Sequence, residues 1–255
     1  MAPRVAEAPA ERSVVTWPTE PQLAQAPAPD DKSALRYEGR TFDEWHNTLQ
    51  KELATDSRLQ AVQALAAFGA NGRGKEAAES ILSVAPQYGL SQWIRALSSG
   101  SDEHGEPLLP TMLAAICGKY GGQSAYQIPR NDSLDVLEAL SKSQDPQRRV
   151  IAIIFLSQFT SNQRAGDVIL ELTYDKDSMV RSWAYGRYMG VSNSPSTQPI
   201  FDYLNQVIKD AKSDDAVNRA QAALDEFKTR HEQNERLLRE SAHPQDSIPD
   251  ARRTQ

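Results

Sequence analysis

Cysteine is nearly absent from this chain of 255 residues, in which Cys117 is the only one. A single thiol cannot form an internal disulfide, so we expect a fold that does not depend on an oxidising compartment. Histidine is also scarce, and none of the four has a second ligand at metal-site spacing (His46, His104, His231 and His243). The nucleophile and dinucleotide motifs of common enzymes are missing too. The sequence therefore predicts no metal, no cofactor and no catalytic residue.

Long apolar runs and an excess of positive charge are missing as well. No stretch approaches the roughly 20 apolar residues that span a bilayer, and residues 1–30 lack the apolar core of a secretory signal. The net charge is −6 and the pI about 5.3, whereas non-specific nucleic-acid binding needs a basic face. We therefore expect a cytoplasmic protein that neither spans a membrane nor binds nucleic acid.

Proline is concentrated at the N-terminus, at positions 3, 9, 18, 21, 27 and 29. Prolines at this density oppose helix and sheet and favour extended, solvated chain. The composition predicts three parts: a disordered Ala/Pro-rich arm over residues 1–36, a folded body over 37–230, and a polar helix end with a disordered tail over 231–255.

Residues 69–76 nearly match the phosphate-binding loop G-x4-G-K-[ST]. Glu76 replaces the hydroxyl residue that would hold magnesium, and its carboxylate would repel phosphate. The loop also follows an expected helix, whereas the nucleotide loop follows a strand. We therefore interpret this segment as a turn between helices.

A short motif, Asp-x3-Arg-x2-Ala, recurs along the chain, and we call it the Asp–Arg–Ala motif. Its copies are Asp145–Arg149–Ala152, Asp177–Arg181–Ala184 and Asp215–Arg219–Ala222, with a weaker one at Arg58–Ala61 that has Ala54 in place of the aspartate. An aspartate in the turn before a helix can cap free backbone N–H groups. An arginine on the first turn can reach carboxylates or carbonyls of a neighbouring repeat, and a small alanine allows close helix packing.

This motif resembles the HEAT-repeat family, in which the second helix of each pair begins D-x-x-V-R-x-x-A-x-x-A-L. Asp177, Val180, Arg181 and Ala184 match it best. The repeats are shorter than standard HEAT units, and they look more like the phycobilisome-lyase-type repeats of bacteria. The resemblance covers residues 145–190 well and 42–230 loosely. It implies an all-α, right-handed α-solenoid of helical hairpins, in which the motif residues are structural.

The third motif copy departs from the family pattern. Asp225 and Glu226 stand where apolar residues are expected, while Leu224 and Phe227 carry the apolar face. The departure indicates either a shifted register or a capping repeat.

Apolar periodicity predicts eleven helices. The first is capped by Thr41 and has the stripe Phe42, Trp45, Leu49 and Leu53, and the second ends at Gly69 in a left-handed cap. The others are expected at about 74–84, 90–98, 106–118, 132–143, 146–159, 164–174, 178–190, 197–211 and from 216 onward. Helix 146–159 has almost no polar face, so it should be buried all round. The longest internal loop is expected at 119–131.

Solenoids present extended faces that bind other macromolecules, so the leading hypothesis is a non-catalytic scaffold or adaptor for a protein partner. Aromatic and arginine side chains dominate contact energies. The candidate partner-binding residues are Trp183, Tyr185, Arg187 and Tyr188 in helix 178–190, with Tyr120 and Tyr126 in loop 119–131. At helical spacing such rings also pack between repeats.

Three alternatives remain open. The family resemblance also allows a bilin-lyase-like or a DNA-glycosylase-like enzyme or enzyme subunit, and the acidic total charge argues against the second. A dimer could form through the last helix, but His231 and Asn234 interrupt its heptad, so a monomer is expected.

Overall fold

The computed structural model describes residues 35–99, 107–118, 126–159, 161–191 and 197–242, and in these residues the protein is all-helical. They contain no β-strand; an isolated β-bridge joins Tyr37 to Arg40. The predicted all-α class is therefore confirmed. The predicted arm over residues 1–36 and the tail after residue 242 lie almost wholly outside the described residues.

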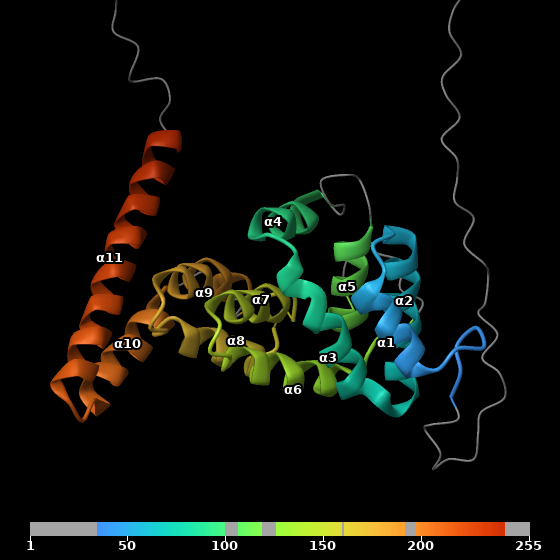
Figure 1. The fold of residues 1–255 in the computed structure, drawn as a ribbon. Helices are drawn as coiled ribbons and strands as arrows, with labels where there is room; N and C mark the ends of the chain where they lie inside the picture. Colours follow the sequence, from blue (N-terminus) through green and yellow to red (C-terminus); the bar gives the residue numbers. More distant parts are fainter. Residues whose placement is uncertain (1–34, 100–106, 119–125, 160, 192–196, 243–255) are drawn as a thin grey trace, which may run out of the picture.

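The helices follow one another in the order that the sequence predicts (Figure 1). They are α1 (Phe42–Lys51), α2 (Thr55–Phe68), α3 (Gly74–Val84), α4 (Leu90–Ser99), α5 (Leu108–Cys117), α6 (Arg130–Ser141), α7 (Pro146–Leu156), α8 (Gln163–Leu172), α9 (Ser178–Val191), α10 (Gln198–Asp210) and α11 (Asp214–Ala242). A wide turn, η2 (Gly69–Arg73), joins α2 to α3, and a short 3₁₀ turn, η3 (Ala85–Gln87), follows α3.

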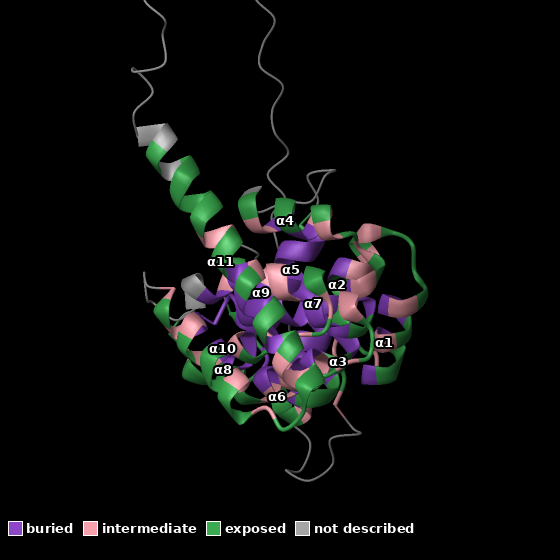
Figure 2. Cartoon of the chain, turned by 90° about the vertical axis from the view of Figure 1, so that its left-hand side faces the viewer, coloured by how far each residue is buried: buried purple, intermediate pink, exposed green. Residues whose placement is uncertain are grey.

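Two sets of helices lie side by side along the molecule. Helices α2, α5, α7 and α9 pack in succession, and α1, α3, α6 and α8 pack in succession beside them. Helices α10 and α11 form a pair at the far end from α1 (Figure 1). Buried residues gather between the two sets, as the purple segments in Figure 2 show. The two best motif copies, on α7 and α9, therefore share one packing layer.

From Arg149 to its end at Leu156, helix α7 is buried on every side, as its composition predicts. Asp145 caps it by accepting from the N–H of Gln147, and Pro146 occupies its first turn, where a missing N–H costs nothing. Val150 and every residue from there to Phe155 are fully buried. Because neighbouring elements cover Arg149 and Ala152, these two motif residues serve packing and not an open surface.

Two details of the N-terminal helices differ from the prediction. Helix α1 begins with the predicted Thr41 cap, which forms a reciprocal capping box with Glu44. However, it ends at Lys51, so Leu53 falls in the following turn and is 94% exposed, not in the apolar stripe. The left-handed residue after α2 is Gly72, not Gly69, because the chain stays helical into the η2 turn. Gly69 is required for another reason: a Cβ there would lie 2.7 Å from Cγ1 of Ile128.

Candidate functional site

Arg149, on the first turn of α7, makes a buried network. Its Nε and Nη2 donate to the Asp175 carboxylate at 2.8 and 2.7 Å, and its Nη1 donates to the carbonyls of Ser143 and Gln144. The Arg149 side chain is 4% exposed and the Asp175 side chain 10%. Asp175 lies in the turn between α8 and α9, so Arg149 joins its own turn to the next one along the molecule.

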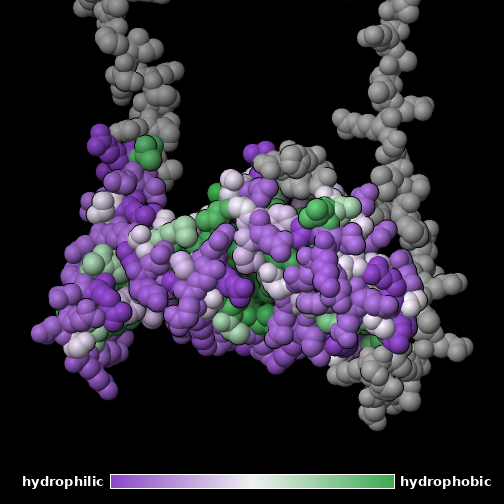
Figure 3. Space-filling view, in the orientation of Figure 1, coloured by the Kyte–Doolittle hydropathy of each residue, from purple (hydrophilic) through white to green (hydrophobic). Residues whose placement is uncertain are grey.

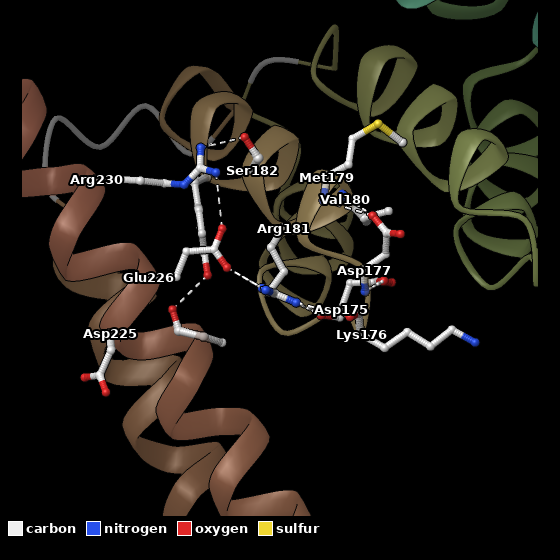
Figure 4. Close-up of polar contacts among 12 residues, drawn as sticks. Asp175, Lys176, Asp177, Met179, Val180, Arg181, Ser182, Asp225, Glu226 and Arg230 are labelled. Atoms are coloured by element: carbon white, nitrogen blue, oxygen red, sulfur yellow. Dashed lines mark hydrogen bonds and ion pairs between the residues drawn. The ribbon is translucent and has the colours of Figure 1, made fainter.

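Arg181, on α9, repeats this geometry (Figure 4). Its Nη1 donates to the carbonyls of Asp175 and Lys176, at the same sequence offsets that Arg149 uses. Its Nε and Nη2 donate to the Glu226 carboxylate of α11 at 2.8 and 2.6 Å. In the sequence, Glu226 stands where the repeat pattern expects an apolar residue, and the structure shows that it instead pairs with Arg181. The prediction that motif arginines reach carboxylates and carbonyls is confirmed for both.

The third motif copy does not repeat this arrangement. Asp215 lies on the first turn of α11, and Arg219 pairs with it within the helix at 3.3 Å. Both side chains are more than half exposed. The prediction that the motif arginine reaches a carboxylate or carbonyl of a neighbouring repeat is therefore wrong for Arg219, because α11 is the last described helix and offers it no following turn. The weaker motif copy on α2 does reach neighbouring elements, because Arg58 donates to Leu49 O and to the Tyr88 hydroxyl.

Two of the predicted partner-binding residues on α9 lie in the core. Tyr185 is 7% exposed and Tyr188 is 8% exposed. The Tyr185 hydroxyl lies 3.1 Å from Thr173 O and 3.0 Å from Ala223 O, and its ring contacts that of Phe227. These tyrosines join α9 to its neighbours and offer little accessible surface.

The other two α9 residues are half-buried and accessible. The Arg187 guanidinium lies over the Trp183 ring, 5.4 Å from its centroid. A cation on an indole face is favourable and holds both groups in one orientation. Among the described residues no carboxylate pairs with Arg187. Trp183 and Arg187 therefore form a pre-positioned contact pair on α9.

The candidate residues of loop 119–131 do not join this pair. Tyr120 lies outside the described residues. Tyr126 is half-buried and meets the Tyr37 ring edge-on at 6.3 Å. Tyr37 precedes α1, whereas α9 lies between α7 and the α10–α11 pair, well away from α1 (Figure 1). The structure therefore separates the predicted residues into two regions.

A groove of about 370 Å³ opens where α9, α10 and α11 meet. Its floor includes Tyr185, Ile200 and Phe227, and its polar rim includes Ser182, Arg230 and Asn234. Arg230 is fixed by bonds to Ser182 at 2.6 Å and to Glu226 at 3.2 Å (Figure 4). The sequence reasoning did not identify this groove, because its walls come from three helices. The available signal was the one-face helical spacing of Phe227, Arg230, His231 and Asn234.

Gly186, on the groove wall, allows a test of the local packing. A Cβ there would meet nothing within 4 Å, and alanine forms helix better than glycine. We expect Gly186→Ala to raise the free energy of unfolding by about 0.4–1 kcal/mol, measured by urea denaturation. The control is Gly118→Ala: Gly118 has φ +69° and Gln127 at 2.8 Å, so this variant should lose about 1–2 kcal/mol. A destabilised Gly186→Ala would contradict the open geometry.

Burial raises the pKa of the Tyr185 phenol above its ordinary value, and the charge of Glu226 adds to the effect. Burial likewise raises the pKa of Tyr37, to about 12. The folded state therefore keeps these phenols neutral where the unfolded chain ionises, near pH 10. Their contribution to stability is present below pH 10 and is lost as pH rises above it.

Alkaline titration tests this expectation. Following tyrosinate absorbance, we expect Tyr185 to ionise only when the protein unfolds. In Tyr185→Phe, one fewer tyrosine should ionise at the pH of unfolding than in the wild type. A native protein in which every tyrosine titrates near pH 10 would contradict the burial of Tyr185.

Sites for metal, nucleotide or reactive thiol chemistry do not emerge in the described part of the chain. It contains no group of three residues able to hold a metal ion. Cys117 is buried, with its Sγ 3.5 Å from Phe155 O. At the start of α3, where a nucleotide loop would place phosphate, a Cβ on Gly74 would lie 1.9 Å from Oδ2 of Asp132. The interpretation as a turn between helices is confirmed for residues 69–73, while residues 74–76 form the first turn of α3.

None of the helices in the described ranges combines the length and apolarity that crossing a membrane requires. Comparison with known proteins gives no family: no family model and no curated protein matches the sequence. An engineered protein of known crystal structure aligns with 72% of this chain and 77% of its own, at 17% identity and a TM-score of 0.27. A likeness at that level supports no conclusion about fold family or function.

Proposed function

We propose that this protein is a non-catalytic scaffold or adaptor that binds a protein partner. We also propose that its helices form a right-handed, HEAT-like α-solenoid. The repeated bonding of Arg149 and Arg181 supports the repeat assignment, because two arginines at equivalent positions hold equivalent carbonyls. The packing of α7 against α9 supports it as well.

The observation that carries the binding proposal is the Trp183–Arg187 pair. Tryptophan and arginine are the side chains most enriched at energetic centres of interfaces. Here the two are held together on one helix, half-buried, beside a groove of about 370 Å³. Preorganised side chains lose little conformational entropy on binding. A partner would cover the indole and pair a carboxylate with Arg187.

The double variant Trp183→Ala/Arg187→Ala tests this surface. We expect it to melt within a few degrees of the wild type, since neither side chain is fully buried. Affinity capture from source cells should yield proteins that crosslink to α9 and α11 in the wild type and are lost with the variant. Arg219→Ala is the matched control, because it removes an exposed arginine on α11 that also lies near an aromatic ring, that of Tyr174. Equal capture by wild type and double variant would remove this surface from the proposal.

A further inference from the structure

A second groove, of about 390 Å³, lies between α3 and α6 where α7 begins. Its floor is aliphatic, formed by Leu82, Val136 and Leu140. Its volume is within the roughly 300–1,000 Å³ of ligand pockets. On the face where α3 and α6 are drawn, Figure 3 shows apolar atoms in a recess near the middle of a mostly hydrophilic surface.

The groove has a direction, because α3 and α6 run the same way. Gly74 at the start of α3 lies against Asp132 at the start of α6, and Lys75 pairs with Asp135 one turn on. Glu79 therefore lies toward the starting end of the groove. Arg148, at the start of α7, lies toward the other end, beyond the last turn of α6.

Both end charges are available to a ligand. Both side chains are exposed. Among the described residues, Glu79 has no cationic partner, and Arg148 has only a 3.9 Å contact with Asp145. The groove thus presents a negative charge at one end, a positive charge at the other and an apolar floor between them.

The surroundings argue against a second copy of this chain as the occupant. A stable homodimer buries about 800 Å² or more on each partner. The outer faces beside the groove instead carry charged groups that are already paired, Lys75 with Asp135 and Arg164 with Glu138. Along α6 the apolar floor runs from Val136 to Leu140, roughly 6 Å along the helix. That length fits two aliphatic side chains spaced one helical turn apart.

We propose that this groove binds an amphipathic α-helix of a partner protein. The helix lies along the groove with its N-terminal end at Glu79 and its C-terminal end at Arg148. In this orientation each end of the helix dipole meets a side chain of opposite charge. Two aliphatic residues at i and i+4 pack over Val136 and Leu140, which are one turn apart on α6, the usual way in which an amphipathic helix enters a groove. This site is separate from the Trp183–Arg187 pair and does not depend on it.

The probe is a displayed library of 14-residue helix-forming peptides, selected on the full chain. We expect the recovered peptides to carry aliphatic residues at i and i+4 and to gain helicity on binding, measured by circular dichroism. Their affinity should fall at least tenfold with Ala139→Arg, which fills the groove from its exposed wall, and with Ser83→Trp on the opposite wall. Ala222→Arg, on an exposed face of α11, is the matched control and should bind as the wild type does.

Charge reversal tests the direction. With Glu79→Lys, selection should shift toward peptides that are acidic at the N-terminal end. Trp183→Ala/Arg187→Ala should bind the same peptides as the wild type, which separates this test from that of the proposed function. The proposal would be overturned by peptides whose affinity is unchanged by Ala139→Arg and Ser83→Trp, or by peptides that bind in an extended form. A dimer in light scattering that Ala139→Arg dissociates would overturn it in favour of self-association.

Discussion

Arg149→Ala is expected to lower the free energy of unfolding by about 3–5 kcal/mol, the usual cost of removing one partner from a buried ion pair. The substitution leaves the Asp175 carboxylate, 10% exposed, without its bidentate partner. It also removes the Nη1 donor from two carbonyls, those of Ser143 and Gln144. A buried acceptor left without a donor keeps its full desolvation cost. Urea denaturation followed by circular dichroism measures the loss.

The other arginines form a graded series. Arg181 makes an equivalent set of bonds, although its Nε and Nη2 both donate to Oε2 of Glu226. Its side chain and that of Glu226 are about a fifth exposed, so Arg181→Ala should cost less, about 1–3 kcal/mol. Arg219→Ala removes an exposed pair and should change stability by no more than about 0.5 kcal/mol. The expected order is therefore set by burial, although the three residues share one motif.

A double-mutant cycle separates pairing from packing. Combining Arg149→Ala with Asp175→Ala should recover part of the loss, with a coupling energy of about 1–3 kcal/mol. The recovery is incomplete, because Asp175 also accepts from the N–H of Asp177. An Arg149→Ala variant that loses less than 1 kcal/mol would contradict the role assigned to this network.

Local signals in the sequence predicted the local structure. The Thr41 cap, the Asp145 and Asp177 caps and the burial of α7 from Arg149 onward each depend on residues within a few positions of one another. Such interactions form inside one helix and its preceding turn, so spacing alone identifies them. The order of the helices followed from the same signals.

Features that depend on which helices meet could not be predicted in this way. Glu226 pairs with Arg181 across 45 positions, and no local sequence pattern around either residue indicates this pairing. The same holds for the exposure of the α9 aromatics. Tyr185 and Trp183 are two positions apart, yet the first faces α11 and the second is accessible, because the packing of neighbouring helices decides which side of α9 is covered.

Trp93→Ala is the second change with a large expected effect. Trp93 is fully buried, its ring meets Phe155 of α7 at 5.2 Å, and its Nε1 lies 3.3 Å from Ala85 O. Replacing a buried tryptophan by alanine costs about 3–5 kcal/mol, partly because a cavity remains. Here the cavity would open against the buried part of α7, so we expect the loss in global unfolding and not in α4 alone.

Amide exchange separates these two outcomes, because local opening exposes only the helix that opens. Exchange in Trp93→Ala should accelerate in α7 as well as in α4. Ile94→Ala is the matched control, since its side chain projects from the same helix and is 46% exposed; it should cost less than about 1 kcal/mol. If Trp93→Ala speeds exchange only in α4 and leaves the urea transition unchanged, then α4 is an appended element. The cooperative core would then consist of the two packed sets of helices without it.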